Sequence, residues 1–284
     1  MRFVVAKERL PLPTIETTLF FEQQVLSTKW INGQSTNQKA QRKFSVSYQP
    51  QPNGAIHVDI TTKLYKVTLP SVLKKQEELI LKISSLIDRL ECVMDHQGRL
   101  SRLLNHREIM DHWAALKPKL MNQYKGSGVI GYIKGIEKKI SNPSELLDDI
   151  NQYRLFGFLF NGLYREYSSE TSENPSNIKR IENAVFGLHY DVEERLELHQ
   201  NKDDQMMVII SGQNANAPSQ EKRFNTMMLN KNVYGGVELV LDTYHGNYLF
   251  SRSSGDVRNA SLCMETSHGK NYKKKQEYEI RLLN

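Results

Sequence analysis

The chain has 284 residues, which is enough for one large domain or two modest ones. Hydrophobic residues make up 39% and charged residues 25%, so the chain can build a core and is not globally disordered. Its two cysteines, Cys92 and Cys263, are too few for a disulfide framework or a four-cysteine zinc site.

The sequence offers no membrane-spanning or secretory segment. No apolar run approaches the roughly 20 residues that cross a bilayer. The first apolar stretch, Phe3–Ala6, is interrupted by charges and prolines before it reaches the length of a signal-peptide core. We therefore expect a soluble, cytoplasmic protein without a membrane span.

Positive charge is concentrated near the N-terminus. The net charge is +6, and residues 1–70 carry nine basic and four acidic side chains. A nucleic-acid-binding domain usually has a denser basic stripe. The cluster Lys273-Lys274-Lys275 is typical of a solvated loop or a guarded strand edge.

Residues 1–70 read as β structure. Residues 43–48 and 55–67 alternate, and the first run places Phe44, Val46 and Tyr48 on one face. Asn53-Gly54 supplies the positive-φ positions of a tight turn and predicts a hairpin between them. The polar residues 31–41 are expected to be a loop.

Residues 71–167 read mainly as helix. Apolar residues recur at helical spacing from Val72 to about Met94, and a hairpin at Gln97-Gly98 is favoured over a helix–turn–helix joint. Pro118 should kink or divide the next helix. A further helix should include residues 154–164, which are apolar on nearly every side and should be the most buried helix of the protein.

The remaining residues read as antiparallel strands. The polar stretch 168–179 predicts a linker, and residues 214–223 predict a mobile loop. Alternation predicts strands over 184–192 and 278–283, and turns are expected at 201–204 and 244–247.

This order predicts an α+β fold, with antiparallel strands at both ends flanking a central helical region. The expected units are an N-terminal β segment (1–70), a central helical region (71–167) and a C-terminal antiparallel β domain (180–284). Sequence alone leaves open whether the two β segments form one sheet or two domains.

Motifs that would reveal chemistry are absent from the sequence. It contains no phosphate-binding glycine loop, no zinc-protease motif and no nucleophile elbow. His106 and His112 lie on different faces of the predicted helix, so we expect no metal site and no cofactor. Cys92 and Cys263 are expected to be buried structural thiols.

The best catalytic constellation lies in the C-terminal β segment. Asp191, Asp242 and His245 could divide acid and base roles in a hydrolase. Both aspartates fall on the polar phase of half-buried strands, however, where solvated carboxylates are expected.

With no catalytic signature, the sequence favours a non-enzymatic protein-interaction module, such as an adaptor, a chaperone or a structural subunit of a larger assembly. Its protein partner would contact large side chains near polar loops. The candidates are Trp30, Arg42, Tyr48 and Tyr65, although Tyr48 also falls on the core face. The alternatives are the hydrolase and a nucleic-acid-binding protein that uses the basic N-terminal segment. The sequence does not determine the oligomeric state.

Overall fold

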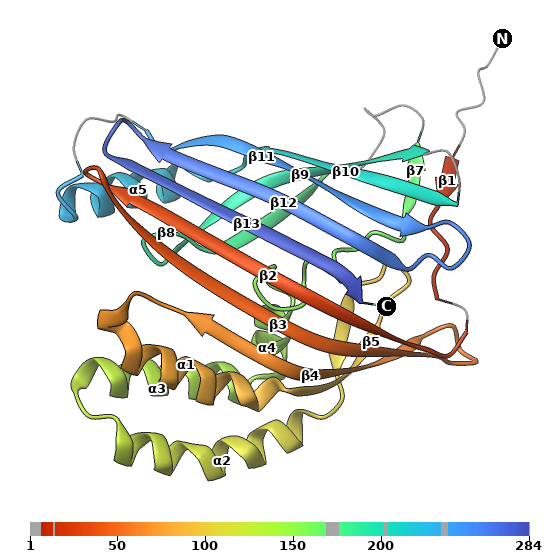
Figure 1. The fold of residues 1–284 in the computed structure, drawn as a ribbon, viewed down its shortest axis with the longest axis horizontal. Coiled ribbons are helices and arrows are strands. Elements are labelled where there is room, and N and C mark those ends of the chain that lie inside the picture. Colours follow the sequence, from red (N-terminus) through yellow and green to blue (C-terminus); the bar gives the residue numbers. More distant parts are fainter. Residues whose placement is uncertain (1–6, 14, 169–175, 201–203, 234–237, 284) are drawn as a thin grey trace.

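A computed structural model describes residues 7–13, 15–168, 176–200, 204–233 and 238–283. The fold is mixed α+β, as predicted, and is dominated by antiparallel strands (Figure 1). The strands are β1 (Lys7–Arg9), β2 (Thr17–Ile31), β3 (Gln34–Pro50), β4 (Ile56–Thr68), β5 (Arg89–Met94), β6 (Leu100–Leu103), β7 (Glu166–Ser168), β8 (Asn177–Val185), β9 (Leu188–Gln200), β10 (Gln205–Asn214), β11 (Val240–Ser251), β12 (Val257–His268) and β13 (Tyr272–Leu283). The helices are α1 (Lys74–Ser84), α2 (His106–Gln123), α3 (Ser127–Ser141), α4 (Pro143–Ile150) and α5 (Pro218–Asn230), with short 3-10 turns η1 (Ser71–Leu73) and η2 (Ser85–Ile87).

One large sheet joins the two ends of the chain. Its strand order is β6-β5-β4-β3-β2-β13-β12-β11-β10-β9-β8, with every neighbouring pair antiparallel. Strands β2 and β13 lie side by side, with Val25 opposite Tyr278. The two strand-rich segments of the sequence therefore belong to a single sheet.

Alternation along the strands gives the sheet a buried inner face and a more polar outer face. Phe44, Val46 and Tyr48 are all buried on the inner face, as their spacing predicts. Helices α1 to α4 gather beside strands β2 to β5, while α5 lies at the other side of the molecule, near one end of β11 (Figure 1). No helix among the described residues is long and apolar enough to cross a membrane.

The aromatic segment 151–165 lies inside the molecule, but it is not the predicted helix. Phe156, Phe158 and Phe160 are at most 3% exposed, so the expected burial is correct. The segment is built from turns, in which Phe156 N donates to Ile150 O and Gly157 N donates to Gln152 O, and Gly157 lies so close to the Asn151 carbonyl oxygen that an added Cβ would be 1.8 Å from it. Helix α4 therefore ends at Ile150, and the aromatic rings fill the interior from a compact, irregular segment.

Predictions for several other segments are also wrong. The expected loop at 31–41 is mostly strand, because Asn32 and Gly33 adopt φ of 49° and 82° and form a tight hairpin turn. The expected turn at 244–247 lies inside β11. The expected loop at 214–223 includes the start of α5, where Pro218 occupies a favourable first-turn position.

Helix and turn boundaries in the central region differ from the sequence pattern. The predicted helix to about Met94 is wrong beyond Ser84, where α1 ends, because the following residues form η2 and then strand β5. A hairpin joins β5 and β6 through Gly98, as favoured from the sequence. Helix α2 continues through Pro118 without division. The predicted linker is wrong where the structure describes it, since Ser168 ends β7 and β8 begins at Asn177. Residues 169–175 of this linker and 201–203 of the predicted turn lie outside the described residues.

Candidate functional site

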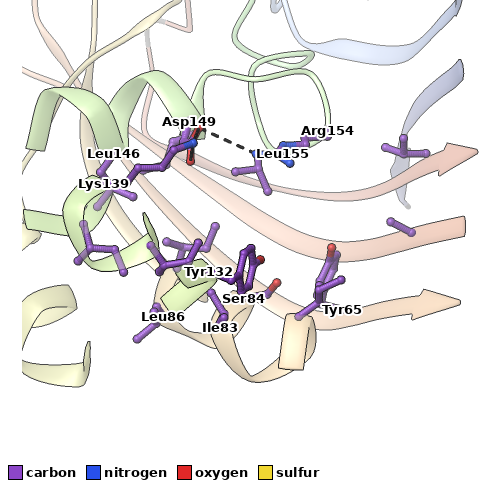
Figure 2. A pocket seen from close by; sticks show the side chains of 17 residues that line it. Tyr65, Ile83, Ser84, Leu86, Tyr132, Lys139, Leu146, Asp149, Arg154 and Leu155 are labelled. Carbon is purple, nitrogen blue, oxygen red and sulfur yellow. Dashed lines mark hydrogen bonds and ion pairs between the residues drawn. The ribbon is translucent and has the colours of Figure 1, made fainter. Parts of the chain in front are cut away.

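An apolar pocket of about 300 Å³ lies between the sheet and the helices beside it (Figure 2). Strands β2 to β4 form one wall, and α1, η2, α3, α4 and the start of the aromatic segment form the others. The lining residues are Val25, Ala40, Tyr65, Ile80, Ile83, Ser84, Leu86, Ile87, Tyr132, Ile136, Lys139, Ile140, Leu146, Asp149, Ile150, Arg154 and Leu155.

The size of the side chains on the inner face explains where the pocket forms. Phe21 and Phe44 are opposite one another in register and their rings stack at 5.6 Å, so they fill the space above that part of the sheet. Four residues along each strand, the opposed pair is Val25 and Ala40. These smaller side chains do not fill the space between the sheet and the helices, so a cavity remains there.

Helical spacing supplies the opposite wall. Ile133, Ile136 and Ile140 recur at three- and four-residue intervals along α3, and the latter two line the pocket. Ile80 and Ile83, three residues apart on α1, also line the pocket. The walls are therefore aliphatic on both sides.

Charged side chains gather at one side of this aliphatic pocket. The ammonium group of Lys139 lies 2.9 Å from both carboxylate oxygens of Asp149, and Arg154 Nη2 lies 3.9 Å from Asp149 Oδ1 (Figure 2). The two cations remain nearly half exposed. This charged edge, Lys139, Asp149 and Arg154, has a formal charge of +1.

The structure brings together two of the predicted partner-binding residues, Arg42 and Tyr65. They are opposite one another on β3 and β4, and the Arg42 guanidinium carbon lies 4.6 Å from the Tyr65 ring centroid. A register shift in the β3–β4 ladder, between the pairs Lys43–Leu64 and Phe44–Thr62, places Tyr65 on the inner face instead of Leu64, which strict alternation predicts there. Arg42 is 3% exposed, and burial lowers the pKa of its guanidinium.

The other two predicted partner-binding residues lie elsewhere. Tyr48 is buried, with its ring centroid 6.5 Å from that of Phe160. Trp30 is half-buried near the far end of β2, where Lys273 lies over its ring at 5.8 Å. It is seven residues along β2 from Gln23, the partner of Arg42, which corresponds to about 23 Å.

The residues of the hydrolase hypothesis remain apart. Asp191 Oδ1 lies 3.2 Å from Arg180 Nε, whereas Asp242 and His245 are exposed on β11. Strand β10 separates β9 from β11. No hydrogen bond or ion pair joins any two of these three described residues.

Sequence reasoning missed a buried polar network around Glu194. This carboxylate is 1% exposed and accepts hydrogen bonds from Tyr153 and Tyr244 at one oxygen and from Asn161 at the other. Nearby, Lys179 donates to Asn161 Oδ1 at 3.0 Å, and burial lowers the pKa of its ammonium group to about 8. Glu194 shares the inward phase of Val192 and Leu196, and this alternation could have identified it.

Cys92 is buried and Cys263 is half-buried, and burial raises the pKa of both thiols. Burial raises the pKa of the Cys92 thiol to about 12, which disfavours the reactive thiolate. Within the described ranges, no three histidine, cysteine, aspartate or glutamate side chains gather closely enough to hold a metal ion.

Comparison with known proteins identifies no family. No protein-family model and no curated protein matches the chain. Among solved structures, the chain is similar to one described as lipid–protein interactions in lipovitellin, at 8% identity and a TM-score of 0.43, covering 94% of this chain and 25% of that one. It is also similar to DynF from the dynemicin biosynthesis pathway of Micromonospora chersina, at 7% identity and a TM-score of 0.23, covering 98% and 85% of the two chains. These likenesses are too distant to indicate a function, which we derive from the pocket itself.

Proposed function

We propose that the protein binds a small amphiphilic molecule, placing its apolar tail in the pocket between the sheet and helices α1, α3 and α4. The observation that supports this proposal is an aliphatic pocket whose charged side chains are confined to one edge. Such a division of surface matches a molecule with one apolar end and one polar end.

The volume limits the class of ligand. About 300 Å³ lies at the lower end of the range for small-molecule sites and corresponds to roughly ten water molecules in the liquid. This space suits one aliphatic chain better than a two-chain lipid or a large cofactor. Each buried methylene group contributes about 0.8 kcal/mol, from which the cost of association must be subtracted.

The side chains that line the pocket suit non-covalent binding rather than catalysis. The pocket walls contain no histidine or cysteine, and the one lining carboxylate, Asp149, is engaged by Lys139. The role of an interaction module, predicted from the sequence, stays a prediction that a pull-down of partner proteins would test.

A chain-length series tests ligand binding directly. We expect the affinity of linear alcohols and fatty acids, measured by calorimetry below their micelle concentrations, to rise with chain length and then level off when the pocket is full. Ile136→Trp should reduce affinity at least tenfold because the indole occupies the pocket. Ile209→Trp is the matched control, since Ile209 is half-buried on the outer face of β10.

The series can also contradict the proposal. The proposal fails if no chain length shows saturable binding. It also fails if Ile136→Trp, folded as judged by circular dichroism, binds the same ligands as tightly as the unmodified protein.

A further inference from the structure

Arg42 carries a buried charge directly beside the pocket. Its guanidinium group is stacked between two rings, with Cζ 4.6 Å from the Tyr65 centroid and 4.7 Å from the Phe156 centroid. Cation–π contacts of this kind stabilise a guanidinium, but they do not neutralise it. The side chain is 3% exposed, so water does not solvate it.

This charge has no carboxylate counterpart. Among the described residues, none lies within ion-pair distance of Arg42, and its Nε and Nη1 atoms are buried without a hydrogen-bond partner. Tyr65, through a side-chain hydrogen bond, and Asp88, at longer range, favour the charged guanidinium, but neither forms an ion pair with it. A buried cation in this condition is costly, and an anion that reached it would remove the cost.

The guanidinium is stacked on a ring that belongs to the pocket wall. Tyr65, its cross-strand neighbour, lines the pocket (Figure 2), and so does Ala40, two residues before Arg42 on the same face of β3. Leu155, which also lines the pocket, precedes the stacked Phe156. A ligand in the pocket therefore lies next to the ring that covers Arg42.

We infer that the pocket selects amphiphiles with an anionic head, and that Arg42 determines this selectivity by pairing with the head after the Tyr65 ring turns aside. This inference rests on the proposed function. The planar guanidinium offers two parallel donors to a carboxylate or a phosphate, which an alcohol cannot match. Lys139 and Arg154 are less suited to this role because they are half exposed and share Asp149.

Four probes with the same twelve-carbon tail separate head from tail: dodecanoate, dodecyl phosphate, dodecanol and dodecyltrimethylammonium. We expect the protein to bind at least one of the two anions at least tenfold more tightly than dodecanol, and the cation most weakly. Arg42→Met should remove this preference while leaving dodecanol affinity within about twofold. Arg154→Met, which removes an exposed cation, should reduce the preference by less than threefold.

The outcomes distinguish this inference from the proposed function. Equal affinity of the unmodified protein for dodecanoate, dodecyl phosphate and dodecanol would overturn the inference and leave tail binding intact, and this comparison needs no variant. Absence of binding by all four probes would overturn both. An anion preference that persists in folded Arg42→Met would overturn the role of Arg42. Arg42→Lys, which keeps the charge and loses the paired donors, should show an intermediate preference.

Discussion

The hydroxyl group of Tyr153 donates a 2.6 Å hydrogen bond to Glu194 Oε1, and both side chains are buried. Tyr244 donates to the same oxygen at 2.8 Å, and Asn161 Nδ2 donates to the other at 3.0 Å. The bonds to Tyr153 and Asn161 attach the aromatic segment, which has no regular hydrogen-bond ladder of its own, to the inner face of β9.

Glu194→Gln should destabilise the protein because all three partners donate. The glutamine amide nitrogen would face a donor, and we expect a loss of about 1–3 kcal/mol in the free energy of unfolding, measured in urea. Glu193→Gln is the matched control on the outer face of β9 and should change stability by less than about 0.5 kcal/mol. Equal losses in the two variants would show that the buried network does not stabilise the protein more than an exposed carboxylate does.

Gly98→Ala should be more harmful than Gly54→Ala, although both glycines occupy turns with similar positive φ values of 85° and 79°. Alanine at positive φ costs about 1–2 kcal/mol at either position. At Gly98 the added Cβ would also lie 2.2 Å from a carbon of the Tyr164 ring, whereas nothing lies within 4 Å at Gly54. We expect a further loss of about 1–3 kcal/mol at Gly98. Thermal unfolding of the two variants measures the difference, and equal midpoints would contradict it.

Glu22 should make stability depend on pH in the acid range. The side chain is 4% exposed, and its bonds to Arg281, at 2.9 Å from Nε, and to Gln41 lower the pKa of its carboxyl group below the ordinary 4.5. Its contribution is therefore present above pH 4.5 and is lost as pH falls through the lower folded-state value. We expect Glu22→Gln to reduce stability at pH 7 and to flatten its decline below pH 5, as measured by urea unfolding.

The control for Glu22 is Glu279→Gln, which alters an exposed carboxylate on the neighbouring strand β13. It should preserve the acid-range slope. The prediction fails if Glu22→Gln and the unmodified protein lose stability in parallel between pH 5 and pH 3.

Lys274 should make stability depend on pH in the alkaline range. It is 7% exposed, and burial, together with nearby Lys29, lowers the pKa of its ammonium group to about 8 from 10.5. Between these values the unfolded chain binds more protons than the folded protein, so stability should rise with pH by up to about 1.4 kcal/mol per unit. Lys274→Met should flatten this rise between pH 8 and pH 9.5, whereas Lys273→Met, which removes an exposed cation paired with Glu265, should not. An unchanged slope in Lys274→Met would contradict the assignment.

Much of the fold could be predicted from the local pattern of apolar residues and glycines. Alternation identified Phe44, Val46 and Tyr48 as core, and Gly98 marked a real hairpin. The pattern was misleading over residues 151–165, where helical spacing of apolar residues coincides with a series of turns in which Gly157 lies against the Asn151 carbonyl.

The candidate site was less accessible to sequence reasoning. Arg42 and Tyr65 could be selected as large side chains, but their contact depends on a register shift after Lys43 that alternation does not reveal. The pocket depends on Ala40 and Val25 being opposite one another and on helices that follow them by more than 30 residues. The pocket forms only when these strands and helices pack together, so the sequence of any one of them does not predict it.

The pairing of β2 with β13 constrains how the molecule can be built. When β2 emerges during synthesis it can pair with β3, but its other edge has no partner until residues 272–283 have been made. The large sheet is therefore completed only when β13 pairs with β2, which joins strands β2 to β6 to strands β8 to β13. This pairing between strands far apart in sequence should make folding slow, and it leaves one edge of β2 open until residues 272–283 have been synthesised.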